Sequence, residues 1–240
     1  MIAPEWAQKV AHALLESHER RERYGDLPVR ARVGDYIRQP FRADRPMRDM
    51  SLREYLDLEY MDWKSGGDTN FAPIATMDGE LDCRGFWSAE QEHPDKDAKF
   101  TSNADKCPTL RDYIAGTGVN FGRMRIIKLE PQDRETAIRS FHRDDNNRFN
   151  PDNSGWVVRS WVELTDNPDS YMLLMDNDEN GLPDPSTEIR VPLHRGARFV
   201  VDTQRLWHVV VHNHDFPRYA LITSFESSPS FASWVNRERL

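Results

Sequence analysis

Apolar positions along the chain follow two different periodicities, and the change falls near Gly118. Before it, apolar residues recur three and four residues apart within polar sequence, which predicts amphipathic helices. After it, short runs rich in Val, Ile, Phe, Trp and Tyr are separated by Asn, Asp, Gly and Pro, which predicts strands joined by turns. We therefore expect a helical and irregular first half followed by a β-rich second half.

The first half carries three helix signals. Apolar spacing predicts an amphipathic helix over residues 4–22. A hydroxyl side chain followed three residues later by an acidic one predicts that further helices begin at Ser51 and Thr109. Residues 63–107 are rich in Gly, Asp, Lys, Pro and Asn. We expect a long irregular stretch there that contains lid segments, because loops of that length are usually functional or mobile.

The second half contains seven strand-like runs. Their close spacing is typical of an all-β sandwich or barrel and not of alternating βαβ units. The sequence near residue 230 predicts a last helix that packs outside them. The predicted strands cover residues 121–131, 155–164, 170–175, 186–193, 197–202, 206–212 and 218–225.

The chain of 240 residues is expected to form a single domain over residues 1–240. Within it we predict a helical and loop part over 1–118, a catalytic core over 119–226 and a C-terminal helix over 227–240. A chain of this length buries roughly 70–75 % of its unfolded surface. It therefore needs no metal to hold its fold, and a metal site would serve chemistry.

Composition narrows the range of partners. The chain has 32 Lys and Arg against 40 Asp and Glu, a net charge of −8, which disfavours a nucleic-acid partner. No apolar run approaches ~18 residues, so we expect no membrane span. With no signal-peptide pattern at the N-terminus and only Cys83 and Cys107 as cysteines, a cytoplasmic location is expected. The expected partner is a small-molecule substrate, and the oligomeric state stays open.

The strongest candidate for chemistry is the sequence His142–Arg143–Asp144 followed by His208. His142 follows a predicted strand and precedes a polar loop, and His208 lies inside an apolar strand. Two imidazoles and one carboxylate on one face form the facial triad that binds non-haem Fe(II) and leaves three coordination positions open. The alternative for His208 is a core histidine beside Trp207.

Two other histidines compete with this assignment. His93–Pro94–Asp95 repeats the His-x-Asp pattern, but it lies in a Pro-rich acidic loop far from strand signals, and we discount it. His212 shares a strand face with His208 and is a rival for the distal ligand.

Further candidates surround the triad. Arg218 begins the strand after His208, and a buried arginine needs an anion to meet it. Its planar fork suits a carboxylate bound bidentately; otherwise it is a surface residue at a strand end. Four residues are candidates for the substrate side of the iron, or else members of an exposed loop and the core: Arg143, Asn146, Trp156 and Trp161.

Residues 120–226 resemble the Fe(II)/2-oxoglutarate-dependent dioxygenases, and within them the branch of aspartyl/asparaginyl β-hydroxylases and proline hydroxylases. The matching pieces are HRD at 142–144, RSWVEL at 159–164, RGARFVVD at 195–202 and WHVVVHNHDFPRYAL at 207–221. The resemblance implies an α+β, mainly β fold, whose core is a double-stranded β-helix (a cupin-like jelly roll) with N-terminal helices and a C-terminal helix.

The resemblance also implies roles and reactants. His142, Asp144 and His208 would bind Fe(II), Arg218 would anchor 2-oxoglutarate, and Arg159 would point at an acid group near the iron. The implied activity is a dioxygenase reaction in which 2-oxoglutarate and O2 are consumed and an unactivated C–H bond of a small polar substrate is hydroxylated. A free amino acid or a biosynthetic intermediate is the expected substrate.

The sequence departs from the family at two points. The branch often has Arg-x-His where this chain has Arg159–Ser160–Trp161, and the Arg-x-Ser pattern of other branches is missing after Arg218. Related halogenases replace the carboxylate ligand by Gly or Ala. Because Asp144 is present here, hydroxylation is favoured over halogenation, while desaturation and ring formation stay open.

Three alternatives remain at this stage. They are a cupin-like metal enzyme that does not use 2-oxoglutarate, a hydroxylase of a protein or carrier-bound residue, and a metal-free β-sandwich binding module.

Asp176, Asp178 and Asn180 match half of a calcium-binding loop. The twelfth position lacks an acidic residue and the flanks are strand-like, so we predict a polar hairpin turn there.

Overall fold

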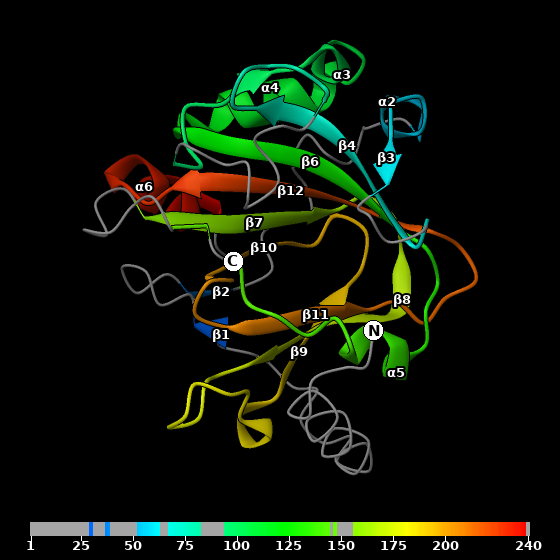
Figure 1. The fold of residues 1–240 in the computed structure, drawn as a ribbon. Coiled ribbons are helices and arrows are strands. Elements are labelled where there is room, and N and C mark those ends of the chain that lie inside the picture. The colour runs from blue at the N-terminus through cyan, green and yellow to red at the C-terminus, as the bar shows by residue number, and fades with distance from the viewer. Residues whose placement is uncertain are drawn as a thin grey trace.

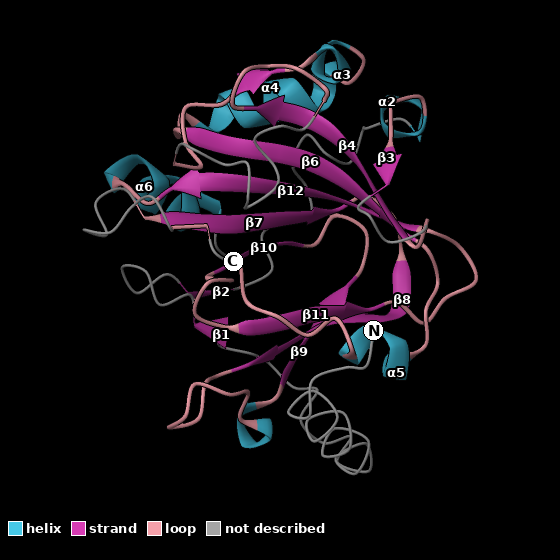
Figure 2. Ribbon diagram, viewed as in Figure 1, coloured by secondary structure: helices cyan, strands magenta, loops and turns pink. Residues whose placement is uncertain are grey.

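The computed structural model describes residues 29–30, 37–38, 52–62, 67–82, 94–144, 146–147 and 156–238. Two antiparallel sheets face each other, and helices lie on the outer sides (Figures 1 and 2). The helix predicted over residues 4–22 lies outside the described residues. No helix in the described ranges has the length and apolar character needed to cross a membrane.

The larger sheet, called the major sheet here, has the order β10-β7-β12-β6-β4-β3, with β5 paired to β4. The smaller, called the minor sheet, has the order β11-β8-β9. Major-sheet strands are β3 (Met61–Asp62), β4 (Thr69–Thr76), β5 (Lys99–Phe100), β6 (Phe121–Leu129), β7 (Val157–Glu163), β10 (Arg198–Val201) and β12 (Arg218–Glu226); minor-sheet strands are β8 (Asn167–Met175), β9 (Ile189–Leu193) and β11 (Trp207–Val211); β1 (Val29–Arg30) and β2 (Ile37–Arg38) pair separately.

The chain passes repeatedly between the two sheets. After β6 in the major sheet, His142 forms a bridge to β11 of the minor sheet. The chain then returns to the major sheet as β7, forms β8 and β9 in the minor sheet, and alternates once more through β10, β11 and β12. This winding is a double-stranded β-helix, so the predicted jelly-roll core is confirmed.

Apolar residues of alternate positions fill the space between the sheets. Trp161 and Phe199 stack there with ring centroids 5.6 Å apart, and Phe71, Ile127 and Met172 belong to the same buried cluster. Because successive side chains of a strand point to opposite faces, the intervening residues face outward. They form a second core between the major sheet and the helices above it.

Several helices lie on the outer side of the major sheet, and the short α5 lies beside the minor sheet (Figure 2). The outer side of the major sheet carries α3 (Ser102–Asp105), α4 (Pro108–Thr117) and α6 (Pro229–Glu238), and α5 (Arg134–Ile138) packs on the outer side of the minor sheet. The predicted helices at 109–116 and at the C-terminus are thereby confirmed. The remaining helical elements are α2 (Leu52–Leu56) and the 3₁₀ turn η4 (Pro185–Thr187).

The prediction of an irregular stretch over 63–107 is wrong at β4. Thr69–Thr76 is an eight-residue strand between β6 and β3, and its last six residues are buried. Pro73 hides this strand in the sequence, because proline cannot donate to a neighbouring strand. The structure accommodates it with a register shift between Pro73 and Ala75 in the pairing with β6.

The segment with half of a calcium loop folds as a turn. Asp178 Oδ1 accepts the backbone N–H groups of Asn180 and Leu182, each at 2.8 Å. Asp178 thus closes its own turn with its carboxylate. The predicted hairpin turn between β8 and β9 is consistent with this geometry.

Candidate metal centre

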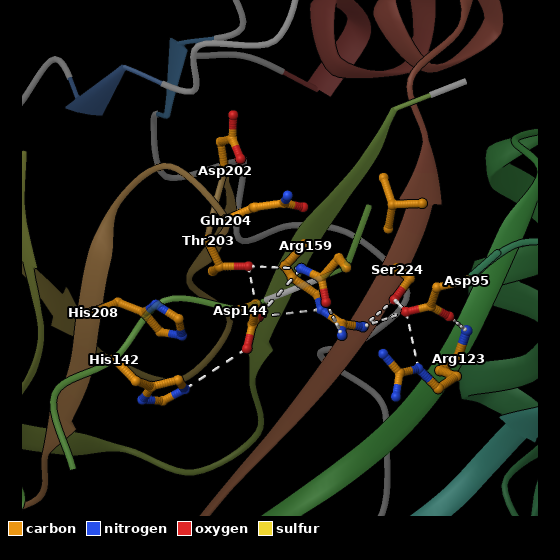
Figure 3. A network of polar contacts seen from close by, with 12 residues as sticks. Asp95, Arg123, His142, Asp144, Arg159, Asp202, Thr203, Gln204, His208 and Ser224 are labelled. Carbon is orange, nitrogen blue, oxygen red and sulfur yellow. Dashed lines mark hydrogen bonds and ion pairs between the residues drawn. The ribbon is translucent and has the colours of Figure 1, made fainter. Parts of the chain in front are cut away.

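His142, Asp144 and His208 converge on one point (Figure 3). One potential ligand atom from each residue lies within 4.8 Å of the others. His142 Nε2 is 3.7 Å from Asp144 Oδ1, and the two imidazole rings have centroids 4.4 Å apart. Two atoms that bind one metal at about 2.1 Å lie at most roughly 4.2 Å apart, and the His142–Asp144 pair meets this limit. The triad predicted from the sequence is therefore brought together by the fold.

Backbone hydrogen bonds fix the positions of the three residues. The N–H of His208 donates to the carbonyl of His142 at 2.8 Å, and the N–H of His142 donates back at 3.2 Å. The N–H of Asp144 donates to the carbonyl of Thr203 at 2.9 Å. The segment that follows α5 is thus tied to β11 and to the loop preceding it, so main-chain contacts hold the three residues near one another.

Both imidazoles present the same nitrogen toward the third ligand. His142 Nδ1 lies 2.6 Å from the carbonyl oxygen of Ser140, and His208 Nδ1 lies 3.3 Å from that of Leu206. A carbonyl oxygen can only accept, so each Nδ1 carries a hydrogen, and in the neutral form of either ring the lone pair lies on Nε2. This is the arrangement by which proteins orient metal-binding histidines.

The charge states of the ligands suit a cation. Burial, reinforced by His142, lowers the pKa of His208 to about 4, so its imidazole is neutral at pH 7. Burial raises the pKa of Asp144, but the hydrogen bond from His142 and the charges of His208 and Arg159 outweigh it and hold the pKa well below its ordinary value. Desolvation lowers the pKa of His142, but its hydrogen bond with Asp144 and the negative charge of Asp144 outweigh this effect, so the pKa is raised overall.

The second oxygen of Asp144 is held by three neighbouring side chains. Thr203 Oγ1 donates to Asp144 Oδ2 at 2.6 Å, Asn146 Nδ2 donates at 3.3 Å, and Arg159 Nε lies 3.5 Å away. These contacts leave Oδ1 on the side of His142. Asn146, a substrate-side candidate in the sequence, is buried and serves this network, and Thr203 was not predicted.

Arg159 connects this carboxylate to a second, fully buried one. Its Nη1 lies 3.1 Å from Asp95 Oδ2, and its Nη2 donates to Asn146 Oδ1 at 2.5 Å. On the far side, Arg123 Nε lies 3.0 Å from Asp95 Oδ2, and Ser224 Oγ donates to the same oxygen at 2.7 Å. Positive and negative groups thus alternate from Asp144 into the interior (Figure 3).

Asp95 is therefore a structural part of the site, although its His-x-Asp motif was discounted. The N–H of Arg123 donates to Asp95 Oδ1 at 2.6 Å, and the side chain is completely buried. Burial raises the pKa of Asp95, but Arg123 and Arg159 lower it to about 2. Gly122 permits this placement, since a Cβ there would collide with the Asp95 backbone.

A further arginine of β6 faces the same interior. Arg125 lies two residues after Arg123 and is 8 % exposed. Burial, and then the positive charges of Arg159 and Arg123, lower the pKa of Arg125 to about 9. The alternation Arg123–Met124–Arg125–Ile126 within a strand-like run was the available signal, because it places both guanidinium groups on one face.

Arg218 is buried and bound by a carboxylate of this chain. Its Nε donates to Glu163 Oε2 at 2.9 Å and its Nη2 donates to Oε1 at 2.5 Å. The bidentate geometry predicted for a ligand carboxylate is thus formed with Glu163 of β7. Burial raises the pKa of Glu163, and the positive charge and hydrogen bond of Arg218 offset only part of this increase.

The other candidates lie in different places. The ring of Trp161 meets His208 edge-on at 6.5 Å in the interior. Trp156 packs against the core on the helix side, with Arg205 5.0 Å above its ring. Arg143 is exposed, donates to Asn177 Oδ1 at 3.0 Å, and lies 5.2 Å from the ring of Trp207. The structure brings only Asn146 and Trp161 of these candidates next to the triad.

His212 has both ring nitrogens occupied by other groups. Nε2 lies 2.6 Å from the carbonyl oxygen of Phe216, and Nδ1 lies 2.8 Å from Ser170 Oγ. Since the carbonyl accepts, Nε2 donates to it and Nδ1 accepts from the serine. The fold therefore gives His212 a bridging role and leaves His208 as the distal partner of the cluster.

Comparisons with known proteins give only distant structural similarity. No family model matches the chain, and no curated protein matches its sequence. Similar solved structures include an oxidoreductase of the 2OG-Fe(II) oxygenase family from Burkholderia pseudomallei. It is 13 % identical, with 72 % of this chain and 74 % of that chain covered and a TM-score of 0.44.

Two further structures show a comparable level of similarity. The non-haem α-ketoglutarate-dependent epimerase SnoN from nogalamycin biosynthesis is 14 % identical, with 74 % of this chain and 71 % of that chain covered and a TM-score of 0.40. A prolyl hydroxylase from Trichoplax adhaerens, in complex with a hypoxia inducible factor peptide, is 12 % identical, with coverages of 97 % and 83 % and a TM-score of 0.34. At these scores function must be inferred from the residues of the site.

Proposed function

We propose that this protein is an Fe(II)- and 2-oxoglutarate-dependent dioxygenase that hydroxylates an unactivated C–H bond of a small polar substrate. The observation that carries the proposal is the convergence of His142, Asp144 and His208 within a jelly roll. Two imidazole nitrogens and one carboxylate oxygen form a facial set that binds Fe(II) and keeps three positions open.

The residues present fit such an ion. Both Nε2 atoms are oriented by carbonyl acceptors at Nδ1, and the low pKa values of His208 and Asp144 provide a lone pair and a negative charge at pH 7. When bound, iron together with 2-oxoglutarate and O2 supplies the oxidising chemistry. The chain contributes ligands, orientation and a partly buried environment.

Asp144 and its neighbours have a positioning role in this proposal. Thr203, Asn146 and Arg159 occupy the Oδ2 side, which directs Oδ1 to the metal as a single ligand atom. Trp161 supports the His208 ring from the interior. These contacts keep the carboxylate from rotating to occupy a second coordination position.

Arg218 and Arg159 are the proposed contacts of the 2-oxoglutarate carboxylates. Both guanidinium groups already bind carboxylates of the chain, Glu163 and Asp95 respectively, so a ligand carboxylate would have to share or replace these contacts. Because burial raises the pKa of Glu163, protonation of Glu163 is favoured when a ligand carboxylate takes its place at Arg218. The buried guanidinium group of Arg125 adds positive charge on the same interior face.

The proposed substrate is a free amino acid or another small biosynthetic intermediate with a carboxylate. Three buried arginines, Arg123, Arg125 and Arg159, lie on one interior face against the carboxylates of Asp95 and Asp144. Positive groups in such an environment favour an anionic substrate.

The test uses the full-length protein, Fe(II), 2-oxoglutarate and a panel of free amino acids in air. We expect succinate together with a product heavier by one oxygen, and no turnover with Asp144→Ala. Before air is admitted, adding Fe(II) and 2-oxoglutarate should produce a visible charge-transfer band. If Fe(II) does not bind, or if it binds in the same way to His142→Ala and His208→Ala, the proposal is refuted.

A second candidate is a cupin-like metal enzyme that does not use 2-oxoglutarate. The bidentate pair of Arg218 and Glu163 favours it, since a neutralised arginine has less need of a ligand carboxylate. The two functions differ in thermal shift: 2-oxoglutarate should stabilise the metal-loaded protein by mass action only if it binds. Metal binding without this shift would support the second candidate over the first.

A further inference from the structure

A cavity of about 610 Å³ lies on the outer face of the minor sheet, beside α5. Its floor is formed by residues paired across three strands, since Tyr171 of β8 lies opposite Val211 of β11 and Pro192 of β9. Directly paired residues share a sheet face. His208 lies an odd number of residues before Val211 on β11, so it points to the opposite face, and the cavity is separate from the metal centre.

One wall of this cavity is an arginine with few partners. Arg134, the first residue of α5, has a side chain that is 10 % exposed. None of its three guanidinium nitrogens makes a hydrogen bond within the described part of the chain. The ion pair to Glu188 Oε2 is long, at 3.9 Å. A guanidinium group buried in this way is costly unless an anion meets it.

Glu188 is engaged mainly by the other arginine of the cavity. Arg190 Nε lies 2.6 Å from Glu188 Oε1, and the Arg190 guanidinium lies 4.8 Å from the centroid of the Tyr171 ring. Both Arg134 and Arg190 line the cavity. Asp133 and Asp169 also line it, but both are exposed, and Asp133 is occupied in accepting the N–H of Thr136 at 2.7 Å.

We propose that this cavity binds a small organic anion whose carboxylate or phosphate group pairs with Arg134. The planar fork of arginine matches either group bidentately. The volume is that of a site for a small molecule, and Tyr171 with Pro192 gives an apolar surface for the body of the ligand. The site does not depend on the proposed iron chemistry.

The experiment uses full-length protein freed of metal on a chelating resin and labelled with ¹³C at tyrosine rings. Benzoate and inorganic phosphate are titrated separately at constant ionic strength. We expect a saturable shift of the Tyr171 resonances, assigned with Tyr171→Phe, and binding at least tenfold weaker in Arg134→Gln. Arg139→Gln is the matched control, because Arg139 is an exposed arginine at the end of α5 that pairs with Glu135; its affinity should equal that of the wild type.

The two probes separate the sources of the anion. Binding of benzoate assigns a carboxylate ligand, and binding of phosphate alone assigns a phosphorylated one; either result supports the site. Absence of a saturable shift with both probes, or equal affinity in Arg134→Gln, overturns it. If Arg134→Gln does not fold, Arg134→Lys keeps the charge without the fork, and unchanged affinity in that variant also overturns the proposal.

Discussion

Thr203 donates a hydrogen bond of 2.6 Å from Oγ1 to Asp144 Oδ2, which leaves Asp144 Oδ1 on the side of His142 Nε2, 3.7 Å away. Oδ2 of Asp144 is thus held by a hydrogen bond within the protein, and Oδ1 is left to face the proposed metal position. Groups that orient a metal ligand in this way usually change metal affinity when they are removed.

Replacing Thr203 by Val should weaken metal binding roughly 10–100-fold, because Asp144 loses its shortest orienting hydrogen bond. Titration of the protein with Co(II), followed by its visible absorption, measures the change. Thr165→Val is the control, since Thr165 also forms side-chain hydrogen bonds but makes them to Asn167 and Tyr219. Equal affinities in the two variants would contradict the role of Thr203.

Substitution by Ala should affect metal affinity at His208 of β11 and stability at His212, which follows β11. His208→Ala removes a ligand of the cluster and should reduce metal affinity by at least ~100-fold, in keeping with the loss of one of three protein ligands. His212→Ala breaks contacts with Ser170 and Phe216 and should lower stability by about 1–3 kcal/mol while metal affinity stays the same. Metal titration and denaturant unfolding of both variants test this, and metal loss in His212→Ala would refute the assignment.

The pair of Arg218 and Glu163 should behave as a buried ion pair. Arg218→Met leaves Glu163 as an uncompensated buried carboxylate and should reduce the free energy of unfolding by about 3–5 kcal/mol. The double variant Arg218→Met, Glu163→Met should recover most of that loss, because both charges are gone. Urea unfolding at pH 7 measures both, and a double variant as unstable as the single one would show that the two charges do not act on each other.

Asp95 should make stability depend on acid pH. Its folded pKa of about 2 lies below the ordinary value of 3.8, so its contribution is complete above pH 4 and is lost as the pH falls toward 2. The full contribution is about 2 kcal/mol, of which about 1 kcal/mol is lost by pH 3. The stability difference between wild type and Asp95→Asn should therefore narrow from pH 6 to pH 3. A constant difference across this range would contradict the low pKa.

The period-two pattern of the second half predicted the strands of the core, and the predicted triad converges. The strand β4 was harder to predict, because Pro73 interrupts its pattern. In the structure, a register shift after Pro73 lets β4 pair with β6. Sequence could not reveal the partner of Arg218. Arg218 and Glu163 are 55 residues apart, and only the register between β7 and β12 brings them together.

Asp95 illustrates a different limit. Its loop has no periodicity, and its burial results from packing against Gly122 and from two arginines on separate strands. The arginines themselves were visible as alternate residues of β6 and β7. What the sequence did not show was which anion would neutralise them, because that depends on the path of a loop in three dimensions.

The reciprocal backbone hydrogen bonds between His142 and His208 bear on how the proposed metal ion would be taken up. The peptide groups already hold the two rings together, so the entropy of bringing distant parts of the chain together is lost during folding and not during metal uptake. Loading should then be a simple bimolecular association without a slow conformational phase, and an ion removed by chelation should return to the same unaltered scaffold.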